Sequence, residues 1–307
     1  MILKKLIIIL LCINYLFAID IGSLNIKNDN DSKIIANDMK QLFQKYKINI
    51  DIKESNNSLQ SINNLINNKT NNYFAIVNKD AIYQYNKNKS TLYDRSIYSK
   101  IPVILTIAEE QIHIFTNHSN EFEFDIKKDF TVYCGEKNGD SCISARYIAN
   151  VYGFNFKYID SNINKIQDDL KTNKVELYIN VKKAPAIEFK DFRDIKLIDL
   201  PTNFKMEDMY VNTLLQKNMY TFLDSDIHTY SVKQALITTL TQKKYESLIN
   251  SILKILVLNQ DYLTTRHRKY WEETTFEYFE YKKLYTTSKQ SINNLLEQVK
   301  RKNAMKF

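Results

Sequence analysis

The sequence predicts an α/β protein in which strands alternate with helices and pair into mostly parallel sheets. Three observations predict this class. Short strand-like apolar runs alternate with helix-like segments along most of the chain before Tyr230. A strand, a glycine-containing loop and a helix follow one another between Asp129 and Phe154. About 290 residues follow a leader segment, which is enough chain for two lobes with separate cores.

Residues 1–18 have the composition of a secretory signal peptide. Two lysines precede an apolar run that is too short to span a bilayer. We expect cleavage near Ala18 and export of the mature chain to the periplasm. The alternatives are an uncleaved signal anchor and a lipid on Cys12, although Leu11 stands where a small residue should precede a lipidated cysteine. No later stretch has the apolar length of a membrane helix.

The first elements alternate between strand and helix. Gly22 and Ser23 are expected to end the first strand in a turn. Asn57 and Ser58 are polar caps in front of a helix, because their side chains can accept hydrogen bonds from its free N–H groups. The predicted strands are 19–23, 48–52, 73–77, 102–106 and 111–115, and the predicted helical segments are 32–46, 59–66 and 78–85.

Three of the chain's four glycines lie in the strand–loop–helix segment. Apolar residues alternate before Gly135, and they recur at every fourth position after Asp140. We expect Asp140 or Ser141 to cap the helix and Gly153 to end it. Free N–H groups at such a helix start can hold an anion, and Gly135 and Gly139 are expected to allow positive φ or a close backbone approach. An ordinary turn is the alternative.

The remaining chain predicts a helix at 162–170, strands at 175–181 and 196–200, and mostly helical structure from Tyr230 onward. Within a helical tail, 266–307, five apolar residues recur at seven-residue spacing. They are Trp271, Tyr278, Tyr285, Ile292 and Val299. We expect this stripe to pack on its own lobe, and a surface for a partner helix is the alternative.

Composition and motif content argue against several function classes. The formal charge of +8 falls to +6 without the two leader lysines, but no basic stripe is interleaved with aromatic residues, so we expect no nucleic-acid partner. The four histidines lie far apart and no cysteines have zinc-ligand spacing, so we expect no metal site. No nucleophile, base and orienting group form a visible set, so we expect a protein that is not an enzyme and has no cofactor.

Cys134 and Cys142 lie on either side of the glycine loop. An oxidising compartment permits a disulfide between them. We expect free thiols, because Cys134 lies in a strand and Cys142 in the first turn of a helix, where the two Cβ atoms need not face each other. The disulfide is the alternative.

The order of these parts resembles the TAXI-type solute receptors of tripartite ATP-independent periplasmic (TRAP) transporters. Asp140 departs from the family pattern, which has glycine in that loop, and Asn78 replaces a glutamine. The family's proline-, histidine- and glycine-containing motif near the C-terminus is absent after Tyr270. The similar stretches include Ile19-Asp-Ile-Gly-Ser23, Ala75–Asp80, Glu110-Gln-Ile-His-Ile114, Asp125–Gly135 and Ala149–Gly153.

This resemblance implies a two-lobed periplasmic-binding-protein fold with a mostly parallel sheet in each lobe and a ligand cleft between them. We expect lobe 1 to comprise 19–107 and 213–307, including the helical tail, and lobe 2 to comprise 112–205. The resemblance further implies a receptor that captures a small organic acid or amino acid and delivers it to a TRAP-type membrane permease. An exported sensor or partner-binding module of the same fold is the alternative.

The ligand is expected where loops follow the carboxyl ends of strands. Backbone donors of two loops, one from each lobe, would hold carboxylate oxygens. The expected ligand contacts are Ser23, Asn57, Ser58 and Asp80 from lobe 1, Gly139, Asp140, Ser141 and Cys142 from lobe 2, and Tyr178, Asn180 and Tyr220 as closing contacts.

Overall fold

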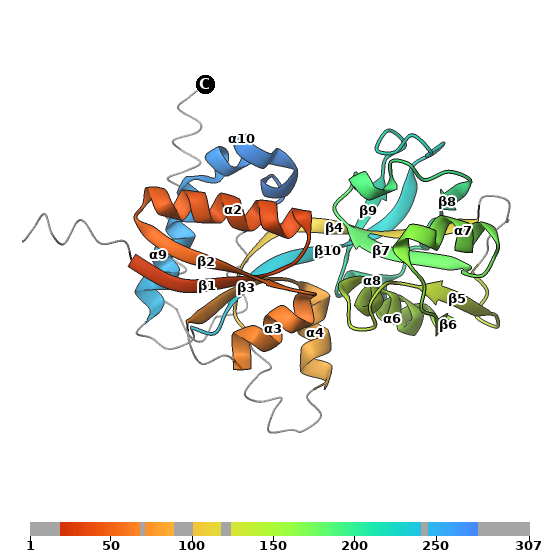
Figure 1. The fold of residues 1–307 in the computed structure, drawn as a ribbon, viewed down its shortest axis with the longest axis horizontal. Helices are drawn as coiled ribbons and strands as arrows, with labels where there is room; N and C mark the ends of the chain where they lie inside the picture. Colours follow the sequence, from red (N-terminus) through yellow and green to blue (C-terminus); the bar gives the residue numbers. More distant parts are fainter. Residues whose placement is uncertain (1–18, 68–70, 89–100, 118–123, 241–244, 276–307) are drawn as a thin grey trace, which may run out of the picture.

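The computed structural model describes residues 19–67, 71–88, 101–117, 124–240 and 245–275 (Figure 1). The predicted signal peptide and the apolar stripe beyond Trp271 lie outside this part of the chain. Two bodies of mixed strands and helices lie side by side, and two long strands run through both of them (Figure 1).

The first body contains the alternating elements that the sequence predicts. The first strand differs from the prediction, because it continues past Gly22 and Ser23 to Lys27, and the residues between are buried. The helix after it is capped by Asp29, whose Oδ1 accepts a hydrogen bond from the Ser32 amide at 2.7 Å. The elements are β1 (Ile19–Lys27), α2 (Asn30–Lys45), β2 (Ile48–Ser55), α3 (Ser58–Asn67), β3 (Asn72–Asn78) and α4 (Lys79–Asn88).

The two long strands are β4 (Val103–Asn117) and β10 (Ile227–Thr238), and both differ from the prediction. The prediction divides β4 into two strands and expects mostly helix from Tyr230 onward. Almost every side chain of both strands is buried. Because both faces are covered, neither strand shows the alternation of apolar and polar residues that identifies a strand with one exposed face.

The second body is built around the glycine segment. Gly153 ends the predicted helix in the left-handed region, with φ of 74°, which confirms its expected role. Gly139 stands at the cap position, and no side chain caps this helix, so the expected cap at Asp140 or Ser141 is wrong. Both of those side chains bind other groups instead, as described below.

The elements of the second body are β5 (Asp129–Tyr133), α6 (Asp140–Tyr152), β6 (Asn155–Tyr158), α7 (Ile166–Lys171), β7 (Leu177–Lys182), β8 (Ile195–Leu197), α8 (Phe204–Glu207) and β9 (Val211–Leu215). Of these, β6, α8 and β9 are not predicted from the sequence. They are short and partly exposed, and so they carry little periodic signal.

Two helices near the end of the described chain, α9 (Glu246–Leu258) and α10 (Gln260–Trp271), pack on the first body. The indole N–H of Trp271 donates to Oδ2 of Asp38 on α2 at 2.9 Å. Arg266 and His267 contact the same buried carboxylate at 2.9 and 2.7 Å. Trp271, where the predicted stripe starts, is therefore a core residue of this body.

One sheet connects the two bodies. Its strand order is β2-β1-β3-β10-β4-β7-β5-β6, with β8 beside β4 and β9 beside β10. Strands within each body are parallel, since β1 pairs with β2 and β3, and β5 pairs with β6 and β7. β4 and β10 pair antiparallel with each other and with all their other neighbours.

Each body has its own hydrophobic core. One buried cluster joins β1–β3 to α2, α9 and α10 and includes Leu24 and Trp271. Another surrounds β5, β7 and α6 and includes Val132. Along β4, the change from the first cluster to the second falls between Ala108 and Ile112. The proposed lobe limits at 107, 112, 205 and 213 stay a prediction.

Gly22 and Gly153 provide a matched test of close packing, because both have positive φ. A Cβ added to Gly22 would lie 2.4 Å from the Asn71 carbonyl oxygen, whereas one added to Gly153 meets nothing within 4 Å. Gly153→Ala should lower the unfolding free energy by about 1–2 kcal/mol through backbone strain alone. Gly22→Ala should cost roughly 1–3 kcal/mol more. Urea unfolding measures both losses, and equal losses would contradict a packing role for Gly22.

Candidate functional site

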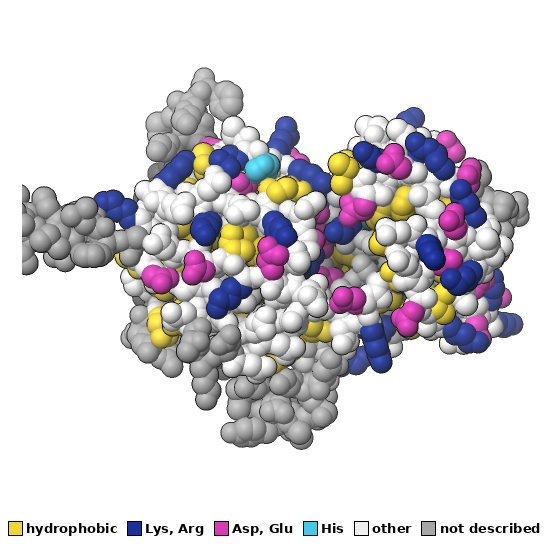
Figure 2. Space-filling view, in the orientation of Figure 1, with side chains coloured by type: hydrophobic (Ala, Val, Ile, Leu, Met, Phe, Trp, Pro, Cys, Tyr) yellow, Lys and Arg dark blue, Asp and Glu magenta, His cyan; other side chains and the backbone are white. Residues whose placement is uncertain are grey.

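A cavity of about 260 Å³ lies between the two bodies. Figure 2 shows a crevice at this boundary in which basic and acidic side chains gather. The carboxyl ends of β1 and β2 meet the starts of α3 and α6 here, which is where open α/β sheets bind ligands. The polar and charged residues that line it are Lys27, Asn28, Asp29, Asn56, Asn57, Glu136, Asp140, Ser141, Asn180 and Lys182.

The floor of the cavity is organised by Lys27, at the end of β1. Its ammonium donates to both carboxylate oxygens of Glu110 on β4, at 2.8 and 2.9 Å. It also lies 3.2 Å from Asp29 and 3.5 Å from Asp140. Burial alone lowers the pKa of Lys27, but the three carboxylates together raise it well above its usual value. The ammonium is therefore charged and surrounded by acceptors.

Glu110 is a buried carboxylate at the middle of β4. Asn78 and Gln234 also donate to it, at 2.8 and 2.9 Å. Burial raises the pKa of Glu110 to about 7, against the attraction of Lys27, which lowers it. Donors from β1, β3 and β10 therefore all bind this one carboxylate of β4, at the floor of the cavity.

Asp140, the first residue of α6, reaches across the boundary to the first body. Its Oδ1 accepts from the Ser58 amide at 3.2 Å, and its Oδ2 accepts from the Ser58 hydroxyl at 3.1 Å. The carboxylate thus occupies the start of α3, where free N–H groups and the helix dipole favour a negative charge. The sequence predicts an anion at the start of α6; at the start of α3, the chain's own carboxylate takes such a position.

Asp80, on α4, makes a second contact between the bodies. Its Oδ2 accepts from the Ser144 hydroxyl of α6 at 2.7 Å and from the Tyr210 hydroxyl at 2.9 Å. Burial raises the pKa of Asp80 to about 6, and the charge of Asp140 adds to that rise. Asp80 lines a smaller cavity of about 160 Å³ between α4 and α6, and it does not line the larger one.

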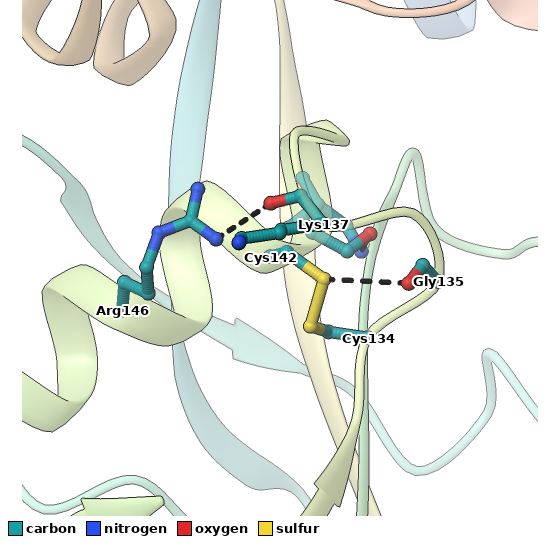
Figure 3. Close-up of a disulfide and its surroundings, with 7 residues drawn as sticks. Cys134, Gly135, Lys137, Cys142 and Arg146 are labelled. Atoms are coloured by element: carbon teal, nitrogen blue, oxygen red, sulfur yellow. Dashed lines mark hydrogen bonds between the residues drawn. A yellow bond between two sulfur atoms is a disulfide. The ribbon is translucent and has the colours of Figure 1, made fainter. Parts of the chain in front are cut away.

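The two cysteines form a disulfide, so the expectation of free thiols is wrong (Figure 3). The β5–α6 loop turns back at Gly135, with φ of 82°, and brings the two Cα atoms to 4.9 Å. This separation lies within the range that a disulfide spans. Gly135 has the expected positive φ, whereas Gly139 has φ of −70°, and a Cβ added there would lie 3.0 Å from the Glu136 carbonyl oxygen.

The structure brings only part of the predicted ligand set to the cavity. Five of the predicted residues line it: Asn57, Gly139, Asp140, Ser141 and Asn180. Ser58 lies at its edge, hydrogen-bonded to Asp140. Ser141 Oγ accepts from the Val181 amide at 3.0 Å and so fixes α6 against β7.

The other predicted contacts lie elsewhere and have structural partners. Ser23 lies within β1 and bonds Asn71 and Asn72, because the strand continues past it. Tyr178 is buried and bonded to Asn180. The Tyr220 hydroxyl lies 2.8 Å from the buried His113 ring and from the Ala186 amide. Asp80 is hydrogen-bonded to Ser144 and Tyr210, and Cys142 is bonded to Cys134 in the disulfide.

Four charged lining residues are missed by sequence reasoning: Lys27, Asp29, Glu136 and Lys182. Lys27 follows the buried run of β1, and Asp29 begins the cap of α2. A polar pair at the end of an apolar strand is the signal that could have identified them. It is overlooked because the strand is predicted to end at Ser23.

Within the described residues, no group of histidine, cysteine and acidic side chains is arranged to hold a metal ion. Across the same part of the chain, no helix combines the length and the apolar character that crossing a membrane requires.

Lys27→Met should lower the unfolding free energy by about 3–5 kcal/mol, because it leaves the Glu110 carboxylate buried without its cation. Adding Glu110→Gln removes that charge while an amide can still bond Asn78 and Gln234. The double variant should therefore recover most of the loss. Urea unfolding of the wild type, both single variants and the double variant measures the recovery. A double variant that loses the sum of the two single losses would contradict the ion pair.

Asp80→Asn should change the pH dependence of stability. The native pKa of Asp80 is raised to about 6 from an ordinary 3.8, so its favourable contribution is complete below that ordinary value and is lost as pH rises through 6. Between about pH 4 and pH 7, the wild type should lose about 2 kcal/mol of unfolding free energy relative to the variant. Urea titrations at both pH values give this difference, and parallel curves would contradict it.

No protein-family model matches the chain, and no curated protein matches it. YhfZ from Shigella flexneri has a similar structure, with a TM-score of 0.51 at 9% identity over 83% of this chain and 94% of that chain. A protein described as a periplasmic transporter gives a TM-score of 0.50 at 9% identity over 91% and 95% of the two chains.

A Candida albicans gene product, described as having the generic periplasmic binding protein structural fold, gives a TM-score of 0.49 at 13% identity over 80% of this chain and 72% of that chain. Identities this low show the fold alone. The predicted fold class, an α/β periplasmic-binding-protein fold, is confirmed.

Proposed function

We propose that the protein is an extracytoplasmic solute-binding receptor, which captures a small organic acid or amino acid and delivers it to a membrane permease. The observation that carries this proposal is the charged cavity between two bodies with separate cores. Side chains of both bodies line it, so a ligand held there would contact both at once. Closure of two bodies on a ligand is a recurring switch in proteins of this fold.

The two bodies are suited to a relative movement. Their covalent connections through the sheet are β4 and β10, and the hydrogen bonds of Asp140 and Asp80 cross between them. Ile143 of α6 also packs in one apolar cluster with Leu59 and Ile62 of α3, so a movement would have to shift this contact as well as the hydrogen bonds. A ligand that adds contacts to both bodies would favour the closed arrangement.

A binding role fits the lining better than a catalytic one. The described lining holds lysines, carboxylates and amides, and these are bonded to one another in fixed pairs. It contains no serine or cysteine nucleophile beside a general base, the arrangement that covalent catalysis needs. We therefore propose that the protein is not an enzyme, that it works in the periplasm, and that its permease is of the TRAP type, as the sequence resemblance implies.

Thermal unfolding of the mature protein with a panel of organic acids and amino acids tests the proposal. A ligand at 100 times its Kd should raise the unfolding free energy by about 2.7 kcal/mol, because it binds only the folded protein. Isothermal titration then gives the Kd and a stoichiometry. A panel in which no compound raises the unfolding temperature would contradict a receptor for these solutes.

The permease step has its own measurement. Membranes from cells that express a candidate permease should retain the liganded receptor more strongly than the ligand-free receptor, since the permease must discriminate closed from open forms. Ligand binding without any permease-dependent retention or uptake would favour an exported sensor of the same fold.

A further inference from the structure

We propose that the ligand of this cavity is recognised through a cationic nitrogen, held by Asp29 and Asp140, and that a purely anionic acid is not its ligand. The inference rests on the proposed receptor function and chooses between the two solute classes named there. It follows from three features of the cavity: its anion donors on the first body are occupied, the charged side chains of its lining have a negative sum, and an acceptor of a lining residue lacks a partner among the described residues.

The donors that could hold a ligand carboxylate on the first body already hold one. The Ser58 amide, the Ser58 hydroxyl and the Lys27 ammonium all lie within 3.5 Å of the Asp140 carboxylate. A ligand carboxylate could reach them only by displacing Asp140, whose side chain is 9% exposed. Displacement would leave two carboxylates in the same small cavity, and like charges at this distance repel.

The charges around the cavity favour a cation. Lys27 and Lys182 are the two cations of the lining, and Asp29, Glu136 and Asp140 are three carboxylates. Lys27 also binds the Glu110 carboxylate beneath it, and Lys182 lies 3.4 Å from the Glu188 carboxylate. Carboxylates therefore outnumber ammonium groups, and both lysines are already paired.

Asp29 is available as a charged acceptor. Burial alone raises its pKa, but Lys27, Lys182 and the Ser32 hydrogen bonds lower it below its ordinary value, so the group is ionised at neutral pH. Asp29 Oδ1 accepts from the Ser32 amide at 2.7 Å, and Oδ2 lies 3.2 Å from the Lys27 ammonium. Asp140 Oδ1 accepts from the Ser58 amide at 3.2 Å. A carboxylate oxygen can accept two hydrogen bonds.

Asn180 points to the same chemistry. Its Nδ2 donates to the Tyr178 hydroxyl, while its buried Oδ1 has no partner among the described residues. A buried oxygen without a donor is costly, and an N–H group of a ligand would satisfy it. An ammonium has three donors and no acceptor, so it suits a lining of carboxylate and amide oxygens better than a carboxylate does.

A carboxylate elsewhere on the ligand is compatible with this scheme. The start of α6, which is 13 residues long, borders the cavity at Gly139 and Ser141. Its first N–H groups favour a negative charge. A zwitterionic amino acid therefore fits, provided that its nitrogen faces Asp29 and Asp140.

The test compares three linear five-carbon probes with different charges: cadaverine, 5-aminopentanoate and glutarate. A wider panel adds the common amino acids and the dicarboxylates of three to six carbons. We expect amine-bearing compounds to bind the full mature protein in thermal-shift and titration measurements, and glutarate and the other dicarboxylates not to bind. Binding of the dicarboxylates alone would overturn the inference and leave the receptor function standing. No binding by either class would overturn both.

Two charge-removing variants and one control identify the residues. Asp140→Asn and Asp29→Asn should each weaken binding of the amine by at least about tenfold, since each removes a full charge. Asparagine caps a helix as well as aspartate does, so Asp29→Asn preserves the start of α2. Asp191→Asn removes an exposed carboxylate outside the cavity and should leave the affinity unchanged.

The direction of the change in each variant is decisive. Suppose that the Asp140→Asn variant unfolds at the same temperature as the wild type but binds dicarboxylates more tightly. The inference would then be overturned, because Asp140 would act to exclude an anionic ligand. If Asp140→Asn does not fold, Asp29→Asn alone decides whether a carboxylate of the cavity holds the amine. Unchanged amine affinity in a folded Asp29→Asn would likewise overturn the inference.

Discussion

The buried ammonium of Lys27 is the charge on which the cleft depends. A lysine with 6% of its side chain exposed is stable only with acceptors around it, and here carboxylates from β4, the β1–α2 turn and α6 provide them. These three elements come from distant parts of the sequence. The need to neutralise one cation therefore fixes the floor of the cavity, one of its walls and one contact across it.

The position of this ion pair follows from the two long strands. Glu110 lies on β4 and Gln234 on β10, close to where the surrounding hydrophobic cluster changes from one body to the other. At this boundary the hydrophobic clusters end beside a polar cavity. The hydrogen-bonded Lys27–Glu110 pair lies there in place of apolar side chains. The sheet is continuous at this point, but the cores on either side are separate.

The sequence predicts the elements whose signal is local, and it fails where the signal depends on distant partners. α2 and α6 are predicted because apolar residues recur on one helical face. The end of α6 at Gly153 is predicted because glycine readily adopts the left-handed conformation that ends a helix. β4 is predicted as two shorter strands and most of β10 as helix, because their neighbours cover both faces. Lys27 is missed because the first strand is predicted to end at Ser23, and its partner Glu110 lies 83 residues away in the sequence. The disulfide depends on how far the β5–α6 loop turns back, which residue types alone do not determine.

Asp140 affects both the contact between the two bodies and the charge of the cavity. The family that the sequence resembles has glycine in this loop, whereas this chain has Asp140, whose carboxylate lies at the start of α3. That carboxylate has two physical effects. It bonds the two bodies together across the cavity, and it adds a negative charge beside Asp29. A ligand that opposes the charge strengthens the existing contact, whereas a ligand that repeats the charge must first break it. The same residue therefore determines both how readily the bodies separate and which sign of charge the cavity accepts.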